Sequence, residues 1–150
     1  MARHTQDGEI VRKDSKILAR AVLRVIDYDA RAAADFETIP LSNIAAEKEI
    51  MRRRWIAGEL VLLGMFRENE RKGTLFISAQ IREGEKLLFV EGCASQGEQC
   101  TYDVFLPKLE EYAREHGCAG ILAETFRPGV FYALNRLGFQ PTKIELIKEI

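Results

Sequence analysis

The residues with the most evident chemistry form a loop between an apolar run and an expected helix. Residues 92–97 read Gly-Cys-Ala-Ser-Gln-Gly, and residues 102–116 carry apolar side chains at helical spacing. A loop that opens a helix presents backbone N–H groups without partners, and such groups suit a phosphate. The alternative interpretation is an ordinary strand-to-helix turn that binds nothing.

Two glutamates stand at the ends of apolar runs of strand length. Glu91 ends the run 86–91, and Glu124 follows the run 119–123. A helix separates the two runs, so a right-handed crossover would make the strands parallel. A carboxylate whose pKa is raised by burial can accept a proton from an attacking group. Alternatively, both glutamates are exposed charges at strand ends.

The cysteines and histidines argue against a zinc site. Cys93, Cys100 and Cys118 are odd in number and lack C-x-x-C spacing, and the only histidines are His4 and His116. We therefore expect no metal, and reduced thiols in a cytoplasmic protein. Cys93 could act as a nucleophile, although no histidine stands out as its partner.

Charge and hydropathy exclude several classes of partner. The 150 residues carry 22 basic and 23 acidic side chains, a net charge of -1, which gives no general attraction to nucleic acid. The N-terminus is polar, and no apolar run approaches the ~18 residues of a membrane-spanning helix. The run Arg52-Arg53-Arg54 is either a solvated helical face or a patch that faces an anion.

The order of elements predicts one α+β domain. A helix is expected from Asp14 or Ser15 through Val25 and Ile26, and a second from Ser42 or Asn43 to Gly58. Short connections then demand antiparallel neighbours among three strands. These strands are followed by a helix, a parallel strand, a short helix and a last strand; the expected ranges are 60–66, 74–81, 86–91, 102–116, 119–123, 129–137 and 144–148.

This order, closed by Leu137-Gly138-Phe139, resembles the GNAT acyltransferases over roughly residues 42–150. The entry Arg127-Pro128-Gly129 is similar to that of GNAT-like proteins of bacteriophages. The resemblance implies a mixed sheet, with an antiparallel meander and then a parallel pair splayed in a V, and helices on both faces. The domain 1–150 then divides into a loose arm (1–12), N-terminal helices (13–57), the meander (58–91) and a cofactor-binding half (92–150).

The resemblance also implies that coenzyme A, most simply acetyl-CoA, is the cofactor. In the family, a bulge in the third meander strand binds the pantetheine arm through backbone amides, and Gly92 suits either such a bulge or the end of the strand. The loop departs from the family pattern Gln/Arg-x-x-Gly-x-Gly/Ala: Ala94 and Gln99 do not match it, and Glu98 would repel phosphates. The residues that we expect to hold the cofactor are Gly92, Cys93, Ser95, Gln96, Gly97, Gln99 and Thr101.

For catalysis, the resemblance makes Glu91 or Glu124 the general base beside the acyl carbon. The family often has a tyrosine four residues before the glycine of Leu-Gly-Phe, where it protonates the leaving thiolate. This chain has Leu134 there. Tyr132 lies about 200° away around the helix, so it could act only if the register shifted.

The function implied is transfer of an acetyl group from acyl-coenzyme A to an unidentified amine. The competing hypothesis is an inactive protein that keeps the fold as a virion, assembly or host-interaction protein, and would be virion-associated. A strand edge at residues 144–147 could pair with a second copy. Nucleic-acid binding through the arginine run is the least favoured alternative.

Overall fold

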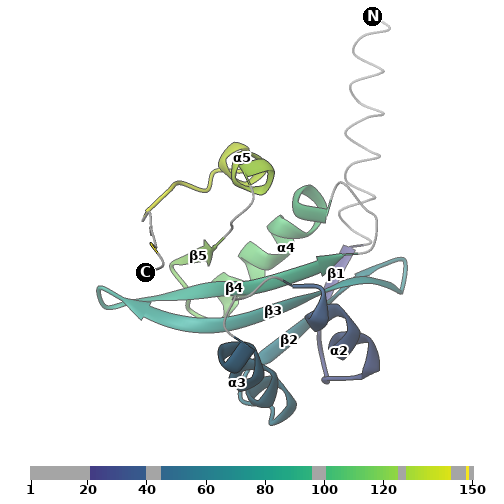
Figure 1. Cartoon of the computed structure of the whole chain (residues 1–150). Helices are drawn as coiled ribbons and strands as arrows, with labels where there is room; N and C mark the ends of the chain where they lie inside the picture. Colours follow the sequence, from purple (N-terminus) through teal and green to yellow (C-terminus); the bar gives the residue numbers. More distant parts are fainter. Residues whose placement is uncertain (1–20, 40–44, 96–100, 125–127, 143–147, 149–150) are drawn as a thin grey trace, which may run out of the picture.

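The computed structural model describes residues 21–39, 45–95, 101–124, 128–142 and 148. Five strands and four helices follow one another along these ranges (Figure 1). They are β1 (Ala21–Ile26), α2 (Ala30–Glu37), α3 (Ala45–Ile56), β2 (Val61–Arg67), β3 (Glu70–Arg82), β4 (Glu85–Ser95), α4 (Thr101–Glu115), β5 (Gly120–Ala123) and α5 (Pro128–Arg136).

The strands form one mixed sheet in the order β1-β2-β3-β4-β5. The first three pairings are antiparallel, and β4 pairs with β5 in parallel. Helices α2 and α3 lie on one face of the sheet, and α4 and α5 lie on the other (Figure 1). The predicted α+β fold, with an antiparallel meander followed by a parallel pair, is confirmed.

The first predicted helix is wrong where the structure describes it. Residues 21–26 form β1, which pairs with β2 from Ala21↔Arg67 to Ile26↔Leu62, and Asp14 and Ser15 lie outside the described residues. The branched side chains of Val22, Val25 and Ile26 favour an extended backbone once a partner strand is present. The helix that follows, α2, begins separately, at the N-cap Asp29.

Each face of the sheet has its own apolar core. On the α4 side, Leu63, Leu75, Ile77 and Leu88 pack against Phe105 and other apolar residues of α4. On the α2/α3 side, three aromatic rings meet edge to face, with centroids 5.1 to 5.7 Å apart. These rings belong to Phe36, Trp55 and Phe76, all of which are fully buried.

Tight turns make β3 and β4 longer than predicted. The β3–β4 turn places Glu83 and Gly84 at φ 52° and 80°, the left-handed backbone that a two-residue hairpin turn requires. The hairpin therefore pairs from Arg82↔Glu85 onward, and β4 continues to Ser95 where the sequence predicted a loop after Glu91.

The C-terminal elements follow the prediction as far as they are described. Helix α5 spans Pro128–Arg136, against an expected range of 129–137, and Gly138 follows it at φ 95°. The expected arm (1–12) and nearly all of the expected last strand (144–148) lie outside the described residues. Within the described ranges, no helix combines the length and apolar character needed to span a membrane.

Candidate functional site

Strand β4 contains a bulge at Glu91. In the pairing with β3, Ile77 is opposite Val90 and Phe76 is opposite Gly92, so Glu91 is an extra residue without a cross-strand partner. Such a bulge re-aims side chains and disturbs the ladder locally. Of the two interpretations of Gly92, the structure supports the bulge, because the strand continues for three residues beyond it.

Packing explains why a glycine follows the bulge. A Cβ atom at Gly92 would lie 2.6 Å from Cγ2 of Ile39, so the Ile39 side chain occupies the space where a side chain of residue 92 would start. Without the extra residue, Glu91 itself would be opposite Phe76, in the aromatic core. The bulge thus moves the carboxylate out of that core.

Glu91 is half-buried and has neighbours from three other segments. The hydroxyl of Ser78 on β3 donates a hydrogen bond of 2.8 Å to its Oε1. Burial raises the pKa of Glu91 above its usual value; the Ser78 hydrogen bond opposes this rise, the charge of Glu124 adds to it and the charge of Arg54 opposes it. The result is a carboxylate that releases its proton closer to neutral pH, as a general base requires.

The described pairing of β4 with β5 ends at this point. The strands are paired from Leu87↔Gly120 to Val90↔Ala123, where β5 ends. Glu91 and Glu124 are the next residues on the two strands, and the charge of Glu124 acts on the Glu91 carboxylate. Beyond them, β4 continues to Ser95 with no described strand on its β5 side, and the splay of the V stays a prediction.

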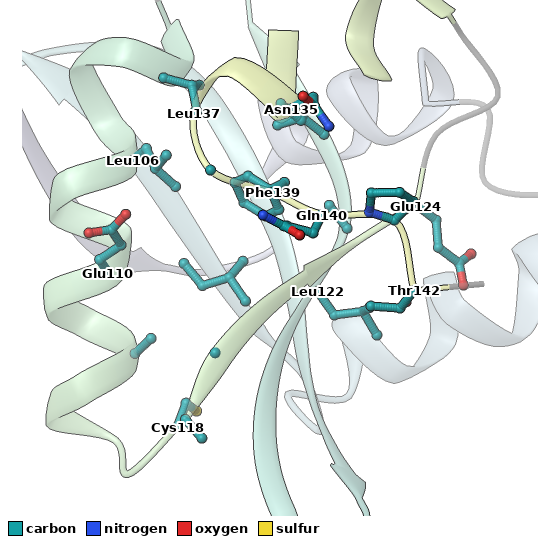
Figure 2. A pocket seen from close by; sticks show the side chains of 18 of the residues that line it. Leu106, Glu110, Cys118, Leu122, Glu124, Asn135, Leu137, Phe139, Gln140 and Thr142 are labelled. Carbon is teal, nitrogen blue, oxygen red and sulfur yellow. The ribbon is translucent and has the colours of Figure 1, made fainter. Parts of the chain in front are cut away.

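A pocket of about 670 Å³ lies between α4, β5 and α5. Figure 2 shows Leu106 and Glu110 of α4 facing Leu137 and the segment after α5 across it, with Cys118 at one end. Glu124 and Thr142 lie together at the other end (Figure 2). Because Glu124 also interacts with Glu91, this end of the pocket adjoins the point where the described pairing of β4 with β5 ends.

The family position of the proton donor, which is Leu134 here, lies in different surroundings from the nearby Tyr132. Leu134, at the position of the family tyrosine, lines the pocket. Tyr132 is 66% exposed on α5 and is not one of the residues that line this pocket. The described pocket wall therefore offers an aliphatic side chain where the family often has a phenol.

Cys93 is unsuited to nucleophilic catalysis. Burial, with a smaller effect of the Asp35 charge, raises the pKa of its thiol to about 12. The side chain packs against the α4-side core, so the thiolate needed for attack does not form near neutral pH. What remains for Cys93 is its backbone, which belongs to β4 beyond the bulge.

Most of the predicted phosphate loop falls outside the described residues. This applies to Gln96, Gly97, Gln99 and the acidic Glu98. Ser95 is the last residue of β4, and Thr101 is the first of α4. The structure thus describes the two ends of the loop, and binding of phosphate there stays a prediction.

Carboxylates neutralise the arginine run of α3. Arg52 pairs with Glu37 and Glu49, Arg53 lies 3.3 Å from Glu49, and Arg54 lies 3.6 Å from Glu59. This arrangement fits the solvated helical face better than an anion-binding patch. Among the described residues, no group of three His, Cys, Asp or Glu side chains could hold a metal ion.

Sequence reasoning missed the contact between Ser78 and Glu91. A signal was available in the sequence. Pairing of the runs 74–81 and 86–91 around a two-residue turn puts Ser78 opposite Phe89. Phe89 is two residues before Glu91, so the two side chains lie on the same face of a regular strand. A hydroxyl in an otherwise apolar strand then stands within diagonal reach of a carboxylate. The bulge that completes the approach had no comparable signal.

The sequence matches no protein-family model and no curated protein. Solved structures, however, share the fold. The aminoglycoside N-acetyltransferase AAC(6')-Iy, in complex with a bisubstrate analogue of coenzyme A, superposes with a TM-score of 0.62 at 10% identity, covering 87% of this chain and 97% of that chain. An acetyltransferase of Trypanosoma brucei gives a TM-score of 0.56 at 15% identity, with 87% and 99% covered.

A third solved structure with this fold is not named as an acetyltransferase. A transcriptional regulator from Bacillus halodurans C-125 gives a TM-score of 0.61 at 15% identity, with 87% of this chain and 99% of that chain covered. The chain thus has the fold of acetyltransferases, the mixed sheet predicted from the GNAT resemblance. The fold by itself does not determine the activity.

Proposed function

We propose that this protein is an acyl-coenzyme A-dependent N-acyltransferase that transfers an acetyl group to an amine. The observation that carries the proposal is the position of Glu91. A half-buried carboxylate with a raised pKa lies where β4 and β5 stop pairing, and Glu124 joins that point to the pocket on the other face. A base and a ligand pocket thus meet at one opening in the sheet.

The residues around the opening fit a coenzyme A thioester. The pocket has a volume within the ~300–1,000 Å³ typical of ligand sites. Its lining combines apolar side chains such as Leu106 and Leu122 with charged ones such as Arg114. The β4 backbone from Gly92 to Ser95, which includes Cys93, has an edge without a described strand beside it and can bond the amides of the pantetheine arm. The pyrophosphate would bind at the loop before Thr101, where α4 begins.

When bound, the thioester supplies an activated acyl group. The acceptor nitrogen attacks the acyl carbon, so a C–N bond forms and the C–S bond breaks. Glu91 takes the proton that the nitrogen loses, and the coenzyme departs as a thiolate. Leu134 has no proton to donate, so in this proposal water protonates the thiolate.

The acceptor would approach from the α2/α3 face, where Glu91 and Ser78 lie. Two of the structural neighbours are aminoglycoside N-acetyltransferases, so aminoglycosides are a sensible first set of acceptors to screen, followed by polyamines and amino-terminal peptides.

Binding and turnover test the proposal separately. We would titrate acetyl-CoA into the protein by calorimetry, then screen amines for release of free thiol. The variants are Glu91→Gln and, as a matched control, Glu111→Gln, an exposed glutamate of α4 away from the opening. We expect saturable binding by all three proteins and turnover by the wild type and the control. Absence of heat at millimolar acetyl-CoA, or full turnover by Glu91→Gln, would contradict the proposal.

A further inference from the structure

Ser78 is a polar residue of β3. It is paired with Phe89 in the β3–β4 ladder, and its Oγ lies 2.8 Å from Oε1 of Glu91. Both side chains are partly buried. The contact therefore joins the bulged residue to the adjacent strand.

The bulge makes the Ser78 hydrogen bond important for the orientation of the Glu91 carboxylate. A regular strand residue has a cross-strand partner that limits where its side chain can lie, but Glu91 has none. Two charges also act on its carboxylate: Glu124, beyond β5, repels it and Arg54 of α3 attracts it. These forces depend weakly on orientation, whereas a short hydrogen bond from a hydroxyl is directional. Ser78 is thus the neighbour able to select one orientation of the carboxylate.

We propose that Ser78 is a positioning residue of the acyl transfer: its hydroxyl anchors Oε1 of Glu91 and leaves Oε2 to accept the proton of the acceptor amine. The inference rests on the proposed function for its catalytic part. The anchoring itself is a property of the free protein and can be measured without turnover.

The first measurement is the titration of Glu91 by carboxyl ¹³C NMR, in the wild type and in Ser78→Ala, Ser78→Thr and Ser78→Cys. A hydrogen bond to the charged carboxylate lowers its pKa, so Ser78→Ala should move the Glu91 midpoint to higher pH. Ser78→Thr keeps the hydroxyl and should restore the wild-type midpoint. Ser78→Cys keeps the size of the side chain but donates weakly, which provides a second test if the alanine variant folds poorly. Gln80→Ala, two residues along the same face of β3, is the matched control and should leave the midpoint unchanged.

The second measurement is steady-state kinetics with whichever amine is accepted. Ser78→Ala should lower kcat roughly ten- to hundredfold, the range for losing one hydrogen bond to a charged group. KM for acetyl-CoA should stay within about twofold, because Ser78 does not line the pocket. The acidic limb of the pH–rate profile should move upward with the NMR midpoint, and Ser78→Thr should recover both.

The outcomes separate the inference from the proposed function. An unchanged Glu91 midpoint in Ser78→Ala and Ser78→Cys overturns the anchoring, whether or not the protein is an enzyme. A shifted midpoint with unchanged kcat and pH profile overturns the positioning role. If the wild type acetylates no amine, the proposed function fails, and the NMR titration still decides whether Ser78 holds the carboxylate.

Discussion

At the scale of single residues, the environment of Glu91 determines what its carboxylate can do. Burial and the negative charge of Glu124 raise its pKa, while Ser78 and Arg54 stabilise the charged form and limit the rise. A glutamate with an ordinary pKa would be ionised near neutral pH but a weak base. A glutamate without these two partners would stay protonated to higher pH. Together, the neighbours of Glu91 leave its pKa above the ordinary glutamate value, which is the direction that the proposed general base needs.

Replacing Glu91 should remove catalysis and leave binding intact. Glu91→Gln keeps the shape and the hydrogen-bond acceptor but cannot take a proton, so we expect kcat to fall by about 10²–10⁴-fold. In the wild type, kcat should decrease as the pH falls and Glu91 becomes protonated, with an inflection above the ordinary glutamate value of 4.5. A pH–rate profile of both proteins checks this. An acidic limb that survives in Glu91→Gln would assign the titration to another group.

The same substitution should change how stability depends on pH. The folded state holds the Glu91 proton to a higher pH than the unfolded chain, because burial raises the folded pKa above 4.5. The contribution of Glu91 is therefore most favourable below that value and is lost as the pH rises through the folded pKa. Glu91→Gln has no such loss, so its melting temperature relative to the wild type should increase from pH 4 to pH 7. Thermal melts of both proteins at several pH values between 4 and 7 measure this difference. A difference in melting temperature that stayed constant across the range would contradict a penalty for burying the charged Glu91.

At the scale of elements, the β4 bulge depends on the fit between Gly92 and Ile39. A methyl group at residue 92 would lie 2.6 Å from Cγ2 and 2.8 Å from Cδ1 of Ile39. Helix α2 ends just before Ile39, so a shift of Ile39 would also disturb the cover over the bulge. The bulge and the helix therefore constrain each other.

Gly92→Ala should destabilise the fold by about 1–3 kcal/mol, the usual cost of overpacking. Ile39→Ala vacates the space, so the double variant should be more stable than the sum of the two single effects predicts. Chemical denaturation of all four proteins measures the coupling. Gly120→Ala is the matched control, because its Cβ would meet only the end of the Leu87 side chain, at 3.3 Å. Additive effects of Gly92→Ala and Ile39→Ala would contradict the packing argument.

A network of hydrogen bonds also attaches α2 to β3. The buried Thr74 hydroxyl donates 2.7 Å to Oδ2 of Asp35 and accepts a bond of 3.0 Å from Nη2 of Arg71. Arg71 also pairs with the N-cap residue Asp29, at 2.6 Å. Because α2 carries both aspartates, the network sets the position of α2 on the sheet.

Thr74→Val should cost about 1–3 kcal/mol, because it leaves charged partners without a buried hydrogen bond. Equilibrium unfolding in urea measures this free energy. Thr74→Ser keeps the hydroxyl and is the control for the network, since it should recover most of the lost stability. Equal losses in the two variants would instead assign the effect to the methyl group.

At the scale of the whole molecule, the sheet separates two halves of the site. The pocket lies on the α4/α5 side, and Glu91 lies on the α2/α3 side with Ser78. They meet only where β5 ends at Ala123 and β4 continues. In the proposed function, the donor and the acceptor approach from opposite faces, so binding of the donor should not require Glu91.

Acetyl-CoA should therefore stabilise the wild type and Glu91→Gln alike. A ligand that binds only the folded state contributes about 2.7 kcal/mol at a hundredfold excess over Kd. For a chain of 150 residues, this corresponds to an increase in Tm of roughly 5–11 °C. Thermal melts at increasing acetyl-CoA would measure the increase for both proteins. A shift in the wild type alone would place Glu91 in the donor site and contradict the two-sided arrangement.

Local patterns in the sequence were sufficient for several parts of this protein. The short connections between the apolar runs predicted the antiparallel meander, and the helix between the runs 86–91 and 119–123 predicted the parallel pair. These features depend on neighbours within a few residues along the chain, or on a chirality rule that holds for nearly all such crossovers.

Other parts were decided only by the tertiary structure. Residues 21–26 fit a helical spacing, and they became β1 because β2 offers an edge to pair with. The register that leaves Glu91 unpaired, and so brings it to Ser78, goes together with Ile39 occupying the space over Gly92. Pairing partners and occupied volume come from residues distant in sequence, so no local pattern encodes them. The sequence by itself thus determined which residues could do chemistry and which sheet would carry them, and tertiary packing decided how they are aimed.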